Sequence, residues 1–193
     1  MYADIDVAKE ILEEAYLHNP GLWREHSYSV AYAAKKIASK TAIIDESKAY
    51  SLGLLHDIGR IKGIYQLKHV IDGYNYMMEM NFDENAKICM THSFPIKIVD
   101  AYSGKNDCSK SETEKIQLFL SNNEYDNYDY LIQLCDAIAM PSGICYLEKR
   151  LIDVAIRNGV NNYSVAKWKS FIQIKNYFDD LLNDDIYKLF NIL

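Results

Sequence analysis

The stretch that decides the fold is Leu54–Arg60, "LLHDIGR", in which an apolar run ends with an imidazole, a carboxylate and a glycine. The apolar residues before it recur at helical spacing, so they predict a helix over 45–57 with His56 and Asp57 at its end. Gly59 is suited to cap that helix. A single His-Asp pair proves little, so its meaning depends on whether similar side chains occur at compatible positions elsewhere.

The same helical spacing continues through most of the 193 residues, which include only three prolines and eight glycines. The pattern predicts an all-α fold. The chain has the length of one ordinary domain. Segments 93–110 and 121–129 are expected to be loops. The expected helices span 4–18, 22–39, 45–57, 67–80, 83–92, 111–120, 128–140, 144–158, 165–182 and 184–191.

Composition excludes several classes of function. The formal net charge is −6 and no dense run of Lys or Arg occurs, which disfavours binding to nucleic acid. No apolar stretch approaches the roughly 20 residues of a membrane helix, and the N-terminus is acidic where a signal peptide would be basic. We therefore expect a cytoplasmic protein with no membrane partner.

The four cysteines are expected to be reduced and structural. Cys89, Cys108, Cys135 and Cys145 form no C-x-x-C pair, and three of them lie in apolar helical patterns. A thiol in such a pattern usually behaves as a small core residue. A thiolate zinc site or a cysteine nucleophile is accordingly disfavoured.

Further His and Asp residues lie on the apolar faces of the expected helices. His26, for example, shares a stripe with Val30, Ala33 and Ile37. Four similar inward positions are predicted, with Asp57 next to one of them. They are His56, His69, His92 and Asp136.

Burying so many imidazoles and carboxylates without partners would cost several kcal/mol each. They must satisfy one another or share a cation, and His and Asp without thiolates suit a first-row divalent metal such as iron or manganese. A carboxylate can bridge two such ions. Each residue taken alone also has an ordinary interpretation as a hydrogen-bonded core residue. His18, near a helix end, is expected to be a partly exposed bystander.

The ordered set His26, His56-Asp57, His69, His92 and Asp136 resembles the bimetallic signature of the HD-domain superfamily of metal-dependent phosphohydrolases. The local contexts "HDIGR", "HVIDG", "MTHS" and "LCDAIA" agree with it. The resemblance covers about 22–140. It implies an HD-domain helical bundle. We expect the chain to form a single domain over 1–193, in which the C-terminal helices of 144–193 pack on the core.

The resemblance also implies ligand roles for two divalent ions. His26, His56, Asp57 and Asp136 would hold one ion. Asp57 would bridge to the second, which His69 and His92 would also bind.

The expected reaction is hydrolysis of a phosphoester or phosphoanhydride bond in a nucleotide-like substrate by a metal-activated hydroxide. Asp57 and Arg60 are the candidate catalytic residues, and Arg60 and Lys62 are candidates to bind phosphate, Arg60 through its bidentate fork. Both cations also have an ordinary interpretation as solvated surface residues. The expected partner is a small phosphorylated molecule, and the oligomeric state is open.

Sequence features narrow the subfamily only by exclusion. The long motif of cyclic-dinucleotide phosphodiesterases is missing after His92, and Gly59-Arg60-Ile61 replaces the Glu-Asp of alarmone hydrolases. The arrangement of His69 and His92 is similar to the branch that hydrolyses diadenosine tetraphosphate, but "AIAMPSG" after Asp136 differs from it. The exact substrate therefore stays open.

Two other functions use the same ligands. Some relatives with this fold use a di-iron centre to activate oxygen, and others bind a nucleotide without turning it over. The sensor alternative is disfavoured because none of the six ligands is missing. The oxygenase alternative cannot be separated from a hydrolase by ligand types alone.

Overall fold

The structure, a computed structural model, describes residues 1–192 and is almost entirely helical. Leu193, the last residue of the expected C-terminal segment, lies outside the described residues. The α-helices are α1 (Ile5–His18), α2 (Trp23–Ala38), α3 (Glu46–Leu55), α4 (Lys68–Glu79), α5 (Asp83–Thr91), α6 (Lys110–Asn122), α7 (Asn127–Ile138), α8 (Leu147–Asn158) and α9 (Ser164–Leu182). The short elements are η1 (Ile58–Lys62), η2 (Val99–Ala101), η3 (Ile186–Phe190), β1 (Ala139–Met140) and β2 (Gly143–Ile144). The all-α prediction is confirmed.

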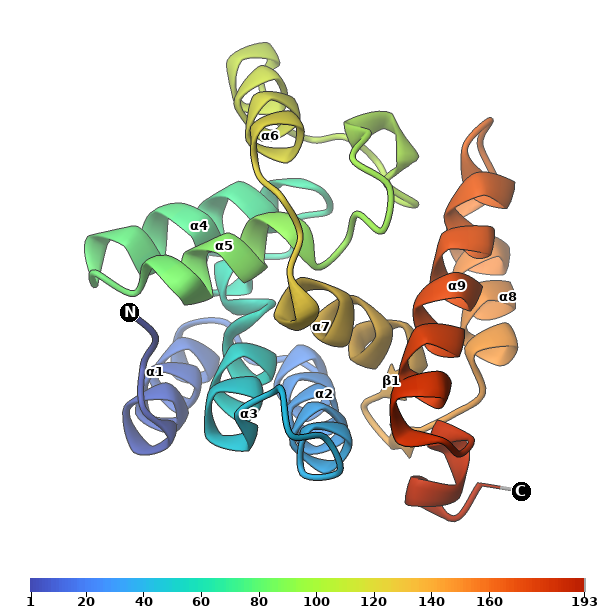
Figure 1. The fold of residues 1–193 in the computed structure, drawn as a ribbon. Coiled ribbons are helices and arrows are strands. Elements are labelled where there is room, and N and C mark those ends of the chain that lie inside the picture. Colours follow the sequence, from blue (N-terminus) through green and yellow to red (C-terminus); the bar gives the residue numbers. More distant parts are fainter. Residues whose placement is uncertain (193) are drawn as a thin grey trace.

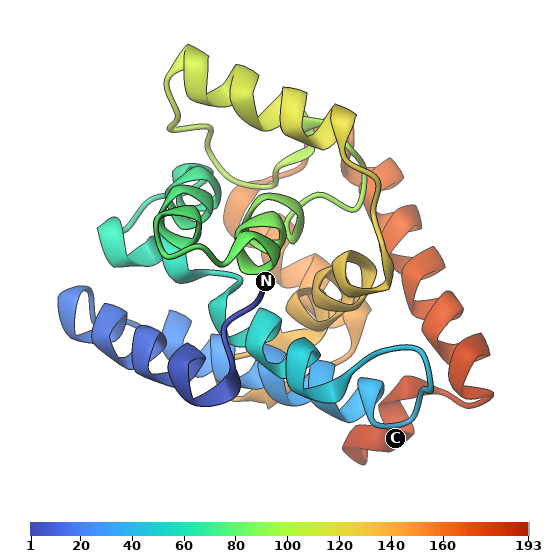
Figure 2. The same ribbon diagram turned by 60° about the vertical axis from the view of Figure 1, so that its left-hand side comes forward.

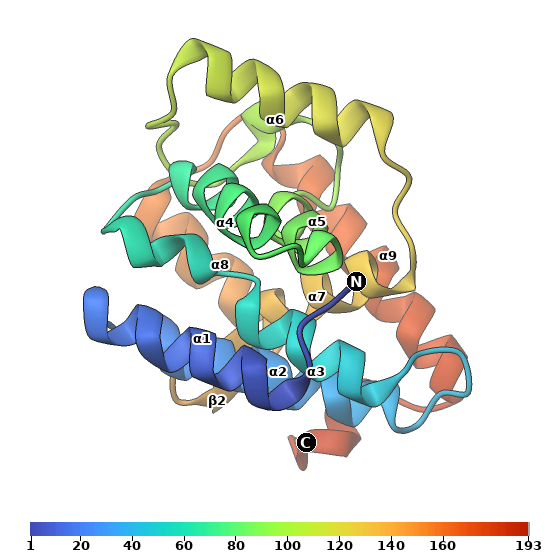
Figure 3. The same ribbon diagram turned by 90° about the vertical axis from the view of Figure 1, so that its left-hand side faces the viewer.

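Helix α7 lies at the centre of the fold (Figure 1). It contacts α2 and α3 of the N-terminal group, α5, and both C-terminal helices α8 and α9. Helices α4 and α5 pack on each other above α1, α2 and α3, and α6 lies beyond them (Figures 2 and 3). The helices that carry the predicted ligands therefore surround one interior region. None of the helices within residues 1–192 combines the length and apolar character needed to cross a bilayer.

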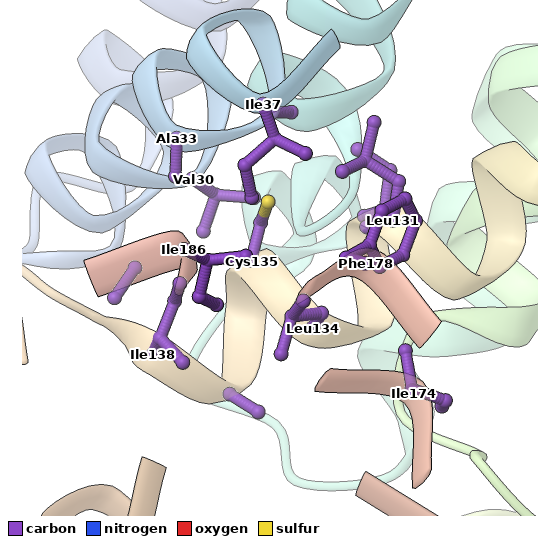
Figure 4. Packing of buried hydrophobic residues seen from close by; sticks show 14 of the residues in the cluster. Val30, Ala33, Ile37, Leu131, Leu134, Cys135, Ile138, Ile174, Phe178 and Ile186 are labelled. Carbon is purple, nitrogen blue, oxygen red and sulfur yellow. The ribbon is translucent and has the colours of Figure 1, made fainter. Parts of the chain in front are cut away.

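The main apolar core joins α2, α7 and the C-terminal elements. Cys135 and Ile138 of α7 lie toward Val30 and Ile37 of α2, and Phe178 of α9 enters the same cluster (Figure 4). All five side chains are fully buried. Burial of a large aliphatic or aromatic side chain stabilises a fold by roughly 1.5–3 kcal/mol. This core therefore fixes α7 against α2, which carry two of the candidate ligands.

Local sequence signals explain the starts of α1, α3, α6 and α7. Asp4 and Asp45 accept hydrogen bonds from the first backbone N–H groups of α1 and α3, and Ser109 and Asp126 form capping boxes at α6 and α7. The expected loop over 121–129 is accordingly shorter than predicted, because α6 extends to Asn122 and α7 begins at Asn127.

Two of the expected helices differ from the structure. The helix expected over 128–140 ends at Ile138, and residues 139–140 pair with 143–144 in a small antiparallel hairpin. Pro141 explains this, because the residue before a proline is driven out of the helical region. The helix expected over 184–191 is the 3-10 segment η3, which ends at Phe190 and is followed by Asn191 in the left-handed conformation with φ 55°.

Gly59 allows an unusually close approach between η1 and α4. A Cβ atom at this position would lie 1.9 Å from the carbonyl oxygen of His69 and 2.5 Å from the amide nitrogen of Gly73. The expectation that Gly59 caps the preceding helix is therefore wrong, because Gly59 lies inside η1. Its missing side chain brings the start of α4 against the residues that follow Asp57.

Replacement of Gly59 by Ala should destabilise the protein by about 3 kcal/mol or more, because a backbone carbonyl has to move to admit the methyl group. Thermal unfolding measures the effect. Gly21→Ala is the matched control, since its Cβ would meet only the flexible side chain of Trp23, at 3.0 Å. Equal melting temperatures for the two variants would contradict the close-packing interpretation.

Candidate metal centre

The structure brings the six predicted ligand residues together. Five of them are at most 7% exposed, and the side chain of Asp136 is 25% exposed. The residues come from five helices or their immediate ends: His26 from α2, His56 and Asp57 from the end of α3, His69 from α4, His92 from the end of α5, and Asp136 from α7.

One group of ligand atoms forms around Asp57. Its Oδ1 atom lies 3.0 Å from Nε2 of His69 and 3.6 Å from Nε2 of His92. The two Nε2 atoms are 3.2 Å from each other. These three residues could hold one metal ion.

A second group lies on the other side of Asp57. His26, His56 and Asp57 place ligand atoms within reach of one ion. Nε2 of His56 is 4.0 Å from Oδ2 of Asp57 and 3.9 Å from Oδ1 of Asp136, and that Oδ1 atom is 2.9 Å from Nε2 of His26. Asp57 is therefore shared by both groups, and Asp136 closes the second one.

Backbone carbonyls fix the orientation of three imidazoles. Nδ1 of His56 lies 2.8 Å from the carbonyl oxygen of Gly53, Nδ1 of His92 lies 3.0 Å from that of Cys89, and Nδ1 of His69 bonds to that of Gln66. Because a carbonyl only accepts, each Nδ1 is the donor, and the neutral ring carries its lone pair on Nε2. All three lone pairs are thus directed into the site.

The Nε2 lone pairs of these three imidazoles lack hydrogen-bond donors from the protein. Nε2 of His56 is buried without any hydrogen-bond partner among the described residues. Nε2 of His69 and Nε2 of His92 face each other and Oδ1 of Asp57, so three acceptor atoms meet with no proton between them. Divalent cations, one in each group, would satisfy these atoms. The residues present therefore fit a metal centre.

Electrostatics favour the protonation states that metal binding needs. Burial, reinforced by the neighbouring His56 and His69, lowers the pKa of His92 to about 3, and burial also lowers that of His56. Burial alone would raise the pKa of Asp57, but the field of the Arg60 guanidinium outweighs it, and the pKa lies well below its usual range. His56 and His92 are thus neutral and the Asp57 carboxylate is ionised, which are the states in which these groups bind a metal.

The predicted phosphate-binding residues occupy different positions. Arg60 lines the cavity beside the candidate metal ligands, and its Nε donates to Oδ2 of Asp57 over 2.6 Å. Lys62 is exposed and is not among the cavity-lining residues, so its position gives no support to a phosphate-binding role. His18 is exposed in the last turn of α1, whereas the other four histidines are buried.

The candidate centre opens into a cavity of about 530 Å³. Part of its wall comes from α8 and α9, including Arg150, Arg157, Lys167 and Trp168. Sequence reasoning missed these residues. One signal was available, because Arg150, Asp153 and Arg157 are spaced by three and four and so share one face of a helix.

A scan against protein families matches the HD domain over residues 23–140. The chain belongs to the HD-domain family. Members of this family are generally metal-dependent phosphohydrolases. The match begins in α2 and ends at β1, so α1, α8 and α9 lie outside it. Comparison with curated proteins and with solved structures finds no match.

Metal loading should stabilise the fold, because a cation relieves the crowding of acceptor atoms around Asp57. With metal at about 100 times its dissociation constant, stabilisation is about 2.7 kcal/mol, or a melting temperature raised by roughly 5–10 °C. Differential scanning fluorimetry with Mn²⁺, reversed by EDTA, measures the shift. Asp57→Asn should lose most of it, and His18→Ala should keep it. A metal-induced shift of full size in Asp57→Asn would exclude the assigned ligand.

Proposed function

We propose that this HD-domain protein hydrolyses a phosphoester or phosphoanhydride bond of a nucleotide-like small molecule with the help of two divalent metal ions. The observation that carries the proposal is the position of Asp57. A single buried carboxylate is shared by two separate groups of ligand atoms, which is the arrangement a binuclear centre requires.

The proposed ligand sets follow the two groups. His26, His56, Asp57 and Asp136 would hold the first ion. Asp57, His69 and His92 would hold the second. Their nitrogen and carboxylate donors favour iron or manganese among the first-row metals.

Two bound ions would lower the pKa of a water molecule and polarise the phosphoryl oxygens. The chain's own residues position the reactants. The bond from Arg60 Nε holds Oδ2 of Asp57, which leaves Oδ1 directed at His69 and His92. The guanidinium also lines the cavity, so its remaining N–H groups are placed to bind a phosphoryl oxygen. Asp57 and Arg60 are therefore the catalytic residues of the proposal.

The volume of the cavity supports a small phosphorylated substrate. A volume of about 530 Å³ suits a ligand of nucleotide size. The chain as a whole carries a formal charge of −6, which disfavours binding to a nucleic-acid backbone.

The cysteines support a reducing compartment such as the cytoplasm. Cys89, Cys108, Cys135 and Cys145 are all free thiols, and three of them are buried. Proteins in oxidising compartments more often pair their cysteines.

The direct test is a panel of phosphomonoesters, phosphodiesters and nucleoside polyphosphates, assayed with protein reconstituted with Mn²⁺ or Fe²⁺. Release of phosphate or a shorter nucleotide is expected with reconstituted wild type. Metal-stripped protein and Asp57→Asn should be inactive, and His18→Ala should match wild type. Oxygen uptake on a polyol or phosphonate, with no hydrolysis of any panel member, would replace the proposal with the oxygenase alternative.

His69→Ala separates the two proposed ion sites. It removes a ligand of only the second ion, so the protein should stay folded and retain one metal per chain instead of two. The turnover rate should fall by more than about 100-fold, beyond the 10–100-fold loss typical of residues that only support a ligand. Elemental analysis and single-turnover kinetics measure these quantities. Two retained metals at full rate would mean that His69 is an ordinary core histidine.

A further inference from the structure

Helices α8 and α9 place an excess of positive charge in the cavity wall. Arg150, Arg157 and Lys167 all line the cavity, and Asp153 is the only carboxylate that these two helices contribute to its lining. Three cations against one carboxylate leave a local charge of +2. This concentration stands out in a chain whose net charge is −6. A fixed positive wall inside a cavity favours an anionic ligand.

The two arginines share their single counter-ion. Oδ2 of Asp153 lies 3.0 Å from Nη1 of Arg150 and 2.9 Å from Nη2 of Arg157. Nε of Arg150 is buried without a hydrogen-bond partner among the described residues. A buried N–H of an arginine without an acceptor is costly. Because Arg150 lines the cavity, an anion there would supply its guanidinium with an acceptor besides Asp153.

Lys167 is a buried cation without a carboxylate. It is 7% exposed, and its Nζ donates to the hydroxyl of Ser103 over 3.1 Å and to the carbonyl oxygen of Ala101 over 3.3 Å. No ion pair of Lys167 occurs among residues 1–192, and its ammonium group has a third N–H to donate. Burying an ammonium group without an anion is unfavourable. The position is therefore suited to receive negative charge from a ligand.

We infer that the α8–α9 wall is a second anion subsite, and that the substrate carries at least two neighbouring phosphate groups. This inference rests on the proposed function. One phosphate would bind at the metal centre beside Arg60, and the other would bind Lys167, Arg150 and Arg157. Because both regions line one cavity, a single molecule can reach them together.

The second subsite selects a phosphoanhydride over a monoester. Water adds to the phosphorus at the metal centre, and the bond from that phosphorus to the bridging oxygen breaks. The bridging oxygen leaves as part of the second phosphate, and the proton from water passes to it or to solvent. Cations on the wall stabilise the charge that develops on this leaving phosphate.

Isothermal titration calorimetry of metal-loaded protein tests the subsite. The probes are methylenediphosphonate, a non-hydrolysable molecule with two anionic groups, and methylphosphonate, which has one. Wild type should bind the diphosphonate at least about tenfold more tightly, because it adds charge-assisted hydrogen bonds. Lys167→Met and Arg157→Gln should each remove most of this preference and leave the affinity for methylphosphonate unchanged.

Matched controls lie on the same helices. Lys169 of α9 and Lys149 of α8 are exposed and do not line the cavity, so Lys169→Met and Lys149→Gln should keep the wild-type preference. Should Lys167→Met fail to fold, Arg157→Gln decides the outcome, because that side chain is already 52% exposed.

The outcomes separate the two proposals. Wild-type preference retained in the folded cavity variants, or equal affinity of wild type for the two probes, would overturn the subsite while leaving a hydrolase possible. A strong diphosphonate preference that depends on Lys167 and Arg157, in a protein that hydrolyses nothing in the panel, would support the subsite and reject the proposed function.

Discussion

The buried carboxylate of Asp57 is the constraint on which the rest of the structure depends. An ionised carboxylate in this position is unfavourable unless cations or strong donors surround it. The protein supplies Arg60 to one oxygen and directs His69 and His92 toward the other. Because the two imidazoles present lone pairs and not protons, the arrangement is incomplete as a hydrogen-bond network. It becomes a satisfied site only when positive charge is added.

Backbone packing around Asp57 follows from this requirement. The chain must turn sharply after α3 so that Asp57 and Arg60 face the same interior region, and α4 must begin close to that turn so that His69 reaches the carboxylate. Gly59 permits both, since any side chain there would collide with the His69 carbonyl. The backbone of α3 also orients a candidate ligand, because the carbonyl of Gly53 accepts the Nδ1 proton of His56. Residues near the centre thus shape the backbone and also orient the ligands.

The sequence predicts which His and Asp side chains gather in one interior region, because helical spacing and side-chain chemistry are local properties. His26 on an apolar stripe or His56 beside Asp57 can be read without knowledge of the fold. Contacts between distant segments could not be read in this way. The pairing of Arg60 with Asp57 and the exposure of Lys62 depend on the η1 turn, whose 3-10 geometry the pattern of residues did not reveal. The cationic wall depends on α8 and α9 folding back toward α7, which no local spacing specifies.

The candidate metal ligands and the cationic wall lie in different parts of the chain. All six candidate ligands lie within the HD-domain match, whereas Arg150, Arg157 and Lys167 lie on helices after it. His26 and Asp136, 110 residues apart, form a polar contact between the first and last helices of the match. Helices α8 and α9 pack directly onto α7, which carries Asp136, so the wall is held in a fixed relation to the candidate centre. Under the proposed function, a change of residues on these two helices would therefore alter which phosphorylated molecule is accepted and leave the six candidate ligands untouched.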